Sequence, residues 1–165
     1  MRRLLLLRHA KSSWNDPNLA DFDRPLNSRG LVAAPFIGEL IVRQDLLPDE
    51  IVSSPAKRAM QTALLVKESA GLDADLRFDE RIYEASPKSL LQVASELKDK
   101  AKCVMLVGHN PGMEGFIGFL TGKVEPMPTA ALAVIDLQIE SWKKIKGGSG
   151  SVKTVIRPKE VMKAH

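Results

Sequence analysis

The sequence predicts an α/β fold, a three-layer α/β/α sandwich with a mostly parallel central sheet of about six strands. Two apolar runs, 4–7 and 102–108, are too short to cross a membrane and are typical of strands that are buried on both faces. Signals for helices alternate with signals for strands along the chain. This alternation favours parallel strands whose connecting helices cover both faces of the sheet.

Six segments carry strand signals. They lie at residues 4–7, 50–53, 74–78, 102–108, 130–139 and 152–157. The last two are expected to form a terminal antiparallel hairpin, with the glycine-rich stretch 147–150 as a turn or flexible connection between them. That stretch is not a phosphate-binding loop, because the chain contains neither the Walker lysine pattern nor a dinucleotide-binding motif.

Four helices are expected, and each follows a residue that commonly begins helices. They start near residues 29, 55, 87 and 111, with Asn27 or Ser28, Ser54, Ser86 and Asn110 as the expected caps. In the first helix, over residues 29–44, Gly30, Pro35 and Gly38 predict an irregular first half. The polar segment 11–28 before it is long for a connection between a strand and a helix, and such loops are often functional.

The composition is that of one soluble domain over residues 1–165. Apolar residues make up 44% of the chain and charged residues 27%, which suits a globular protein with a core of its own. The single cysteine, Cys103, cannot form an internal disulfide, so we expect a reducing, cytoplasmic location. No signal peptide or membrane span is evident. The basic excess over 141–165 predicts a solvated hairpin and tail rather than a nucleic-acid contact.

Two histidines, His9 and His109, each follow one of the two most apolar strands. Because ligands of parallel sheets bind at the carboxyl ends of the strands, we expect both imidazoles at one edge of the sheet. Arg8 precedes the first histidine, and Arg58 lies in the first turn after another strand, at the same edge. With helix N-termini beside them and no carboxylate expected between them, these side chains predict a pocket for a dianion, above all a phosphoryl group. Taken alone, His9 also fits a simple cap of its strand.

Three motifs resemble those of the histidine phosphatase superfamily, which includes the cofactor-dependent phosphoglycerate mutases and acid phosphatases. They are RHA at 8–10 followed by WN at 14–15, SPAKRAMQT at 54–62, and GHN at 108–110. The block DRPL at 23–26 with Gly30 resembles a further family motif. The chain lacks room for the long lid insertions of the mutases, and it most resembles the small bacterial phosphohistidine phosphatases. The resemblance implies a phosphoglycerate mutase-like fold.

The resemblance also implies roles for single residues. His9 is the nucleophile that becomes phosphorylated, and Arg8, Arg58 and His109 hold the phosphoryl oxygens. This set suits phosphoryl transfer, which depends mainly on positioning and electrostatic stabilisation. Asn15 matches an asparagine on the phosphate side of the mutase motif, although a turn residue in a polar loop is the alternative.

Glu84 is the candidate proton donor, because it lies in the region of the loop that carries the acid in larger relatives. An ester leaving group needs a proton. A phosphohistidine leaving group needs less help, since imidazole leaves well when its free nitrogen is protonated. An exposed loop carboxylate with no catalytic role is the alternative interpretation.

Together these features predict a metal-independent phosphatase that works through a phosphohistidine on His9 and needs no cofactor. Its substrate is expected to be a phosphorylated protein, or else a small phosphoester. The alternatives are a small-molecule phosphomonoesterase of the same superfamily and a non-catalytic module that binds a phospho-ligand. A metal site made of His9 and His109 is disfavoured, because the two neighbouring arginines repel a cation. The physiological phosphodonor and the oligomeric state stay open.

Overall fold

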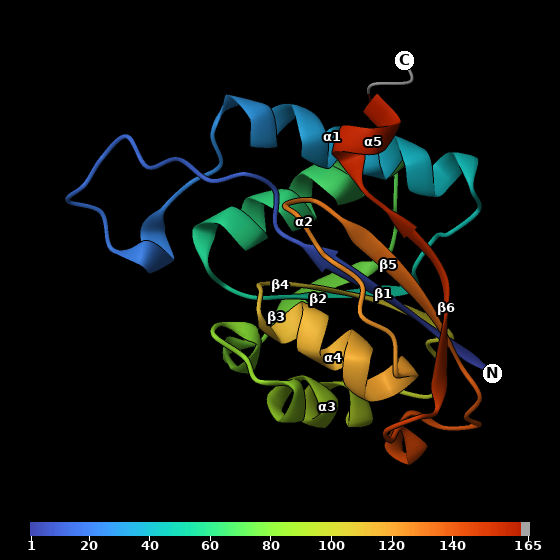
Figure 1. The fold of residues 1–165 in the computed structure, drawn as a ribbon. Coiled ribbons are helices and arrows are strands. Elements are labelled where there is room, and N and C mark those ends of the chain that lie inside the picture. Colours follow the sequence, from blue (N-terminus) through green and yellow to red (C-terminus); the bar gives the residue numbers. More distant parts are fainter. Residues whose placement is uncertain (163–165) are drawn as a thin grey trace.

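A single six-stranded sheet forms the centre of the protein in the computed structural model, which describes residues 1–162 (Figure 1). Its strands are β1 (Arg2–Arg8), β2 (Glu50–Ser53), β3 (Asp75–Phe78), β4 (Cys103–Gly108), β5 (Leu132–Leu137) and β6 (Gly150–Ile156), in the order β3-β2-β4-β1-β5-β6. The first four in this order are parallel, and β5 runs antiparallel to both β1 and β6. The predicted fold class is confirmed, including the terminal hairpin.

Helices cover both faces of the sheet, so the molecule has three layers (Figure 1). One layer holds α1 (Ser28–Arg43), α2 (Lys57–Ala70) and the short α5 (Pro158–Met162), and the other holds α3 (Pro87–Ser95) and α4 (Gly112–Thr121). Alternate side chains of β1 enter the two cores: Leu5 and Leu7 pack on the α1 and α2 side, and Leu4 and Leu6 on the α3 and α4 side. This is why β1 is apolar at consecutive positions.

The expected helix caps are right at two helices and wrong at the other two. Asn27 accepts a hydrogen bond from the backbone N–H of Gly30, and Ser86 accepts one from Ser89. Ser54 does not cap α2, which starts only at Lys57: its Oγ accepts the backbone N–H of Ala56, before the helix begins, and is also hydrogen-bonded to a histidine ring. At α4 the cap position falls on Pro111 rather than Asn110, although the Asn110 side chain still accepts the N–H of Glu114.

Helix α1 is continuous over Ser28–Arg43, so the expectation of an irregular first half is wrong. Its two glycines serve close packing. A Cβ at Gly30 would lie 2.3 Å from the carbonyl oxygen of Lys11, and one at Gly38 would lie 1.7 Å from Ser69 Oγ. The close packing that these glycines allow against the 11–28 loop and α2 stabilises the helix by more than the weak helix propensity of glycine costs.

The hairpin strand β5 is shorter than the expected segment 130–139, because Ala130 has a φ of 61° and leaves the strand conformation. Its backbone N–H donates instead to the carbonyl oxygens of Arg8 and His9. The short helices η1 (Asp21–Asp23), η2 (Glu80–Ile82), η3 (Trp142–Lys144) and α5 have no counterpart in the prediction. No helix in the described residues is long and apolar enough to cross a membrane.

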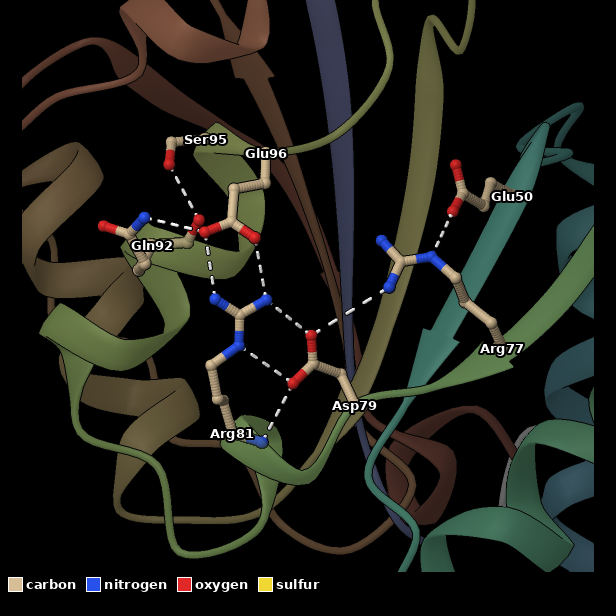
Figure 2. Close-up of polar contacts among 7 residues, drawn as sticks. All are labelled: Glu50, Arg77, Asp79, Arg81, Gln92, Ser95 and Glu96. Atoms are coloured by element: carbon tan, nitrogen blue, oxygen red, sulfur yellow. Dashed lines mark hydrogen bonds and ion pairs between the residues drawn. The ribbon is translucent and has the colours of Figure 1, made fainter.

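A charged network fixes the segment that follows β3 (Figure 2). Arg81 donates to both oxygens of Asp79 and to both oxygens of Glu96, and Arg77 bridges Glu50 and Asp79. The hydrogen bonds from Arg81 hold the pKa of Glu96 down at about 2. Exposed ion pairs contribute little singly, but a shared, two-pronged arginine gives a defined geometry. The network thereby joins η2 to the end of α3. Tyr83 and Glu84 follow η2 directly along the chain.

Candidate active site

The two predicted imidazoles lie side by side at the carboxyl edge of the sheet. Strands β1 and β4 are parallel neighbours with Arg8 opposite Gly108, so His9 and His109 leave adjacent strands at the same level. Their ring centroids are 5.1 Å apart. The backbone N–H of His9 also donates to the carbonyl oxygen of Gly108, which holds the two strand ends together.

The ring of His9 has a defined tautomer. Its Nδ1 lies 2.7 Å from the carbonyl oxygen of Ala10. A carbonyl oxygen can only accept, so Nδ1 carries the proton, and Nε2 of the neutral ring carries the lone pair. That lone pair accepts a long, 3.4 Å hydrogen bond from Nε of Arg58. The unprotonated nitrogen therefore faces a cation, which attracts anions.

Arg58 is held from the other side by the 11–28 loop. Its Nη1 donates to the carbonyl oxygen of Asp21, and its Nη2 donates to Asp21 Oδ2 at 3.0 Å. The expectation that no carboxylate lies within this cluster is therefore wrong. The reason is tertiary, because η1 folds back so that Asp21 meets the first turn of α2. Asp21 fixes the guanidinium plane while Nε stays turned toward His9.

Tyr83 closes this group of side chains. Its hydroxyl donates to Asp21 Oδ2 at 2.7 Å, and its ring packs edge-on against His109, with 5.5 Å between the ring centroids. Phe22, next to Asp21, packs edge-on against the same tyrosine ring. The segment after η2 and the 11–28 loop thus meet over the two histidines.

Two buried polar atoms at the site have no hydrogen-bond partner among residues 1–162. They are Nδ1 of His109 and Nε of Arg8. His109 uses its other nitrogen, Nε2, for a 2.8 Å hydrogen bond with Ser54 Oγ, and Arg8 uses Nη1 to donate to the carbonyl oxygen of Met127. Buried polar atoms without partners are rare and costly, and at a binding site they indicate where a ligand is held.

Thr62 connects the segment that follows β1 to the helix that carries Arg58. Its hydroxyl donates to the carbonyl oxygen of Arg58 and accepts the backbone N–H of Ala10. The side chain of the preceding residue, Gln61, accepts the backbone N–H of Leu26 and anchors the end of the 11–28 loop. The spacing between His9 and Arg58 is therefore set by buried hydrogen bonds as well as by the sheet.

The two remaining candidates are placed differently. Glu84 is exposed at a φ of 54°, a conformation that is unusual for a residue other than glycine, and it lies directly after Tyr83. Asn15 is exposed in the 11–28 loop. Neither side chain makes a hydrogen bond or ion pair with another described residue. The roles of both residues stay predictions.

Four residues of this site were not singled out from the sequence: Asp21, Ser54, Thr62 and Tyr83. Asp21 and Tyr83 lie in loops whose paths depend on tertiary packing, so periodicity carries no signal for them. Ser54 was assigned to a helix cap, which is the commoner use of a serine before proline. Thr62 is the one with a readable signal, since it lies four residues after Arg58 on the same face of α2.

Burial controls the charge state of the histidine pair. It lowers the pKa of His9 from 6.5 to about 4, with a smaller contribution from the cationic Arg58. Burial likewise lowers the pKa of His109 to about 3, followed by the effects of His9 and Arg58. The hydrogen bond from Tyr83, helped by Arg58, holds the pKa of Asp21 below its usual range. At neutral pH the site therefore combines neutral imidazoles with an ionised Asp21.

The first prediction concerns these charge states. In nitrogen-correlated NMR spectra, we expect the rings of His9 and His109 to stay neutral down to about pH 5, with His9 protonated on Nδ1. Because both pKa values are lowered by folding, the unfolded chain takes up protons first as the pH falls. The free energy of unfolding should therefore decrease between pH 6.5 and about 4. Titration of either ring near pH 6.5 contradicts this electrostatic description.

The second prediction concerns Asp21. Replacing Asp21 with Ala removes the carboxylate that accepts from Arg58 Nη2, and with it a negative charge close to any bound anion, while the backbone carbonyl that accepts from Nη1 remains. We expect kcat on nitrophenyl phosphate to fall about ten-fold, because the guanidinium is less well positioned. KM should fall too, because ground-state repulsion is relieved.

Asp23→Ala is the matched control, since Asp23 lies in the same short helix without a side-chain partner among the described residues. It should leave both constants within about two-fold of wild type. If the two variants behave alike, Asp21 does not position Arg58.

The site combines a neutral imidazole with two guanidinium groups and a second imidazole at the carboxyl edge of a parallel sheet. This combination is typical of α/β proteins that handle phosphoryl groups. Residues 4–114 match the histidine phosphatase superfamily (branch 1). The chain belongs to that superfamily.

Individual relatives agree with this assignment. The chain is 30% identical over 159 residues to an uncharacterized chloroplastic protein of Arabidopsis thaliana, covering 90% of this chain and 72% of that one. A crystal structure of the putative phosphohistidine phosphatase SixA from Agrobacterium tumefaciens superimposes with a TM-score of 0.82 at 30% identity, covering 95% and 98% of the two chains. A 2,3-bisphosphoglycerate-dependent phosphoglycerate mutase of Arthrobacter is 35% identical over 119 residues, which span 68% of this chain and 44% of the mutase.

Proposed function

We propose that the protein is a metal-independent, cytoplasmic phosphatase that removes a phosphoryl group, from phosphohistidine on a protein, through a phosphohistidine intermediate on His9. The observation that carries this proposal is the tautomer of His9. The Ala10 carbonyl keeps the proton on Nδ1, so the lone pair of Nε2 faces the cationic Arg58, and a phosphoryl group attracted by Arg58 takes the place of the long hydrogen bond between them.

In the first step, the lone pair of His9 Nε2 forms a bond to phosphorus, and the bond from phosphorus to the substrate nitrogen or oxygen breaks. The leaving group takes that electron pair and a proton, which Glu84 supplies to an ester oxygen and solvent supplies to an imidazole; Glu84 regains its proton from solvent. The ring of His9 becomes more positive, and the Ala10 carbonyl stabilises it through the hydrogen bond to Nδ1. Arg8, Arg58 and His109 stabilise the three phosphoryl oxygens.

In the second step, a water oxygen attacks phosphorus, and the bond to Nε2 breaks. The electron pair returns to Nε2, the protons of the water go to phosphate and solvent, and His9 is again neutral. The low pKa of His9, about 4, favours this return, because the free ring is not trapped as an imidazolium at neutral pH.

A protein substrate is supported by two observations. The relative with 30% identity and a TM-score of 0.82 is described as a putative phosphohistidine phosphatase. The chain also spans only 44% of the mutase it matches, so this likeness covers less than half of that enzyme. In the proposed function, the contacts that position the reacting phosphoryl group come from the substrate protein itself.

The test is a comparison of substrates with EDTA present throughout. We expect kcat/KM on a phosphohistidine-bearing protein to exceed that on any common sugar phosphate by at least ~10²-fold, or about 2.7 kcal/mol of transition-state stabilisation. A sugar phosphate that is turned over equally well would instead favour a small-molecule phosphomonoesterase. Binding of phosphate compounds without turnover would favour a non-catalytic module.

The third prediction concerns Glu84 as proton donor. Glu84→Gln should slow hydrolysis of an alkyl phosphate by roughly 10²-fold, because its leaving group needs a proton. Nitrophenyl phosphate and phosphohistidine, whose leaving groups need less help, should be affected much less. Glu80→Gln, in the neighbouring helix η2, is the control and should change neither rate. Equal losses on alkyl and nitrophenyl phosphate would exclude Glu84 as the acid.

A further inference from the structure

A groove of about 870 Å³ lies between the start of α1, the segment before β5 and helix α5. The two helices lie close together on the same face of the sheet (Figure 1). The apolar part of its lining, here called the floor, includes Val32 and Met162, whose exposed fractions are 59% and 36%. Exposed apolar side chains gathered in a concave site are typical of a binding surface.

The rim of the groove is cationic. Lys11, Arg29 and Lys159 line it, and no Asp or Glu among the described residues does. None of the three has an ion pair within residues 1–162, whereas arginines elsewhere, such as Arg3, Arg77 and Arg157, are paired with carboxylates. Three unneutralised cations around one apolar floor attract an anionic partner.

The position of Arg29 strengthens this interpretation. It lies in the first turn of α1, where the helix dipole disfavours a cation, and that turn contains no acidic residue. The arrangement costs helix stability unless an anion is bound nearby. Arg29 therefore suits a function in binding better than a function in folding.

The groove also adjoins the phosphoryl site. Lys11 lies two residues after His9, and Pro128 lines both this groove and the cavity of about 630 Å³ that contains Arg8. The segment at Pro128 is held in place by its neighbour Met127, because the carbonyl oxygen of Met127 accepts from Arg8 Nη1 and from Asn110 Nδ2. The groove therefore lies close to the phosphoryl site, with Pro128 as the shared boundary.

We infer that this groove docks an acidic segment of the substrate protein, in which carboxylates alternate with apolar side chains next to the phosphorylated histidine. The carboxylates pair with Lys11, Arg29 and Lys159, and the apolar side chains cover Val32 and Met162. The inference rests on the proposed function for the identity of the partner. Binding to the groove is nevertheless measurable without any turnover.

The experiment uses two matched peptides with a single histidine, one containing glutamate and leucine and the other glutamine and leucine. Fluorescence anisotropy of the unphosphorylated peptides measures docking alone. We expect the acidic peptide to bind at least about ten-fold more tightly than the neutral one, and Arg29→Glu/Lys159→Glu to abolish that difference. Val32→Ser should weaken binding of the acidic peptide about three-fold through the apolar floor.

Lys88→Glu/Lys98→Glu is the control, because it reverses two exposed charges in and just after α3, on the opposite face of the sheet. It should bind the acidic peptide like wild type. Equal affinity for the two peptides, equal losses in both double variants, or a groove-dependent preference for a single-stranded oligonucleotide over the acidic peptide would each overturn the inference.

The phosphorylated peptides separate docking from chemistry. Arg29→Glu/Lys159→Glu should lower kcat/KM on the acidic phosphopeptide about ten-fold and leave nitrophenyl phosphate within about two-fold. If the acidic peptide docks in the groove but its phosphohistidine is not hydrolysed, the proposed substrate class is wrong, while docking in the groove is supported. If both phosphopeptides are hydrolysed equally by wild type, the docking inference is wrong, while the proposed phosphatase activity is supported.

Discussion

Replacing His9 with Ala is expected to lower phosphatase activity by at least ~10⁴-fold, because the variant lacks the only atom proposed to form a bond with phosphorus. Nε2 of His9 is the unprotonated nitrogen of its ring and faces Arg58 Nε at 3.4 Å. In the proposed mechanism His109 holds a phosphoryl oxygen, so we do not expect it to take the place of His9. Stopped assays on nitrophenyl phosphate and on a phosphohistidine protein measure this loss.

The fold of this variant should persist, because the strand end remains tied by backbone hydrogen bonds from His9 to Gly108 and from Ala130 to His9. We expect the circular dichroism spectrum to be unchanged and tungstate to remain bound by Arg8, Arg58 and His109. Residual activity within 10²-fold of wild type, in a folded variant, would show that His9 is not the nucleophile.

Replacing Arg58 with Ala is expected to lower kcat/KM by about 10³-fold, the lower range for an arginine that stabilises a transferring phosphoryl group. The loss should fall mainly on kcat, since the charge on the oxygens is redistributed as the bond breaks. Arg58→Lys should restore little. One ammonium group cannot donate to both the carbonyl and the carboxylate of Asp21 while a third donor faces His9.

Arg43→Ala is the control for loss of an arginine near a carboxylate, because Arg43 forms an exposed 3.9 Å ion pair with Glu39 at the far end of α1. Such a pair contributes little to stability, so activity and melting temperature should stay close to wild type. A lysine at position 58 that restores full activity would mean that only the charge of Arg58 matters and that its orientation by Asp21 does not.

The sheet and the histidine pair were predictable because their signals are local and strong. The apolar runs that end at Arg8 and Gly108 define buried strands, and parallel pairing of those strands brings His9 and His109 together without any further information. Helix starts were less predictable where a side chain had a competing use. Ser54 has a cap-forming sequence around it, yet its hydroxyl is hydrogen-bonded to His109.

The loop contacts could not be predicted, because they depend on where two irregular segments meet. Asp21 lies 37 residues from Arg58 and 62 residues from Tyr83, and no periodicity connects the three. Gly38 was misleading for a similar reason: its poor helix propensity is visible in the sequence, whereas its close approach to Ser69 on α2 is not. The groove beside α1 depends on α5, a short helix that was not expected.

The central claim is that His9 carries the phosphoryl group during turnover, and trapping the intermediate tests it most directly. Wild-type protein is mixed briefly with labelled substrate, quenched in alkali and analysed by peptide mass spectrometry. We expect a phosphate on Nε2 of His9 that is stable in alkali, lost in acid and absent from His9→Ala. A phosphate that survives acid, or one located on Ser54 or His109, would contradict it.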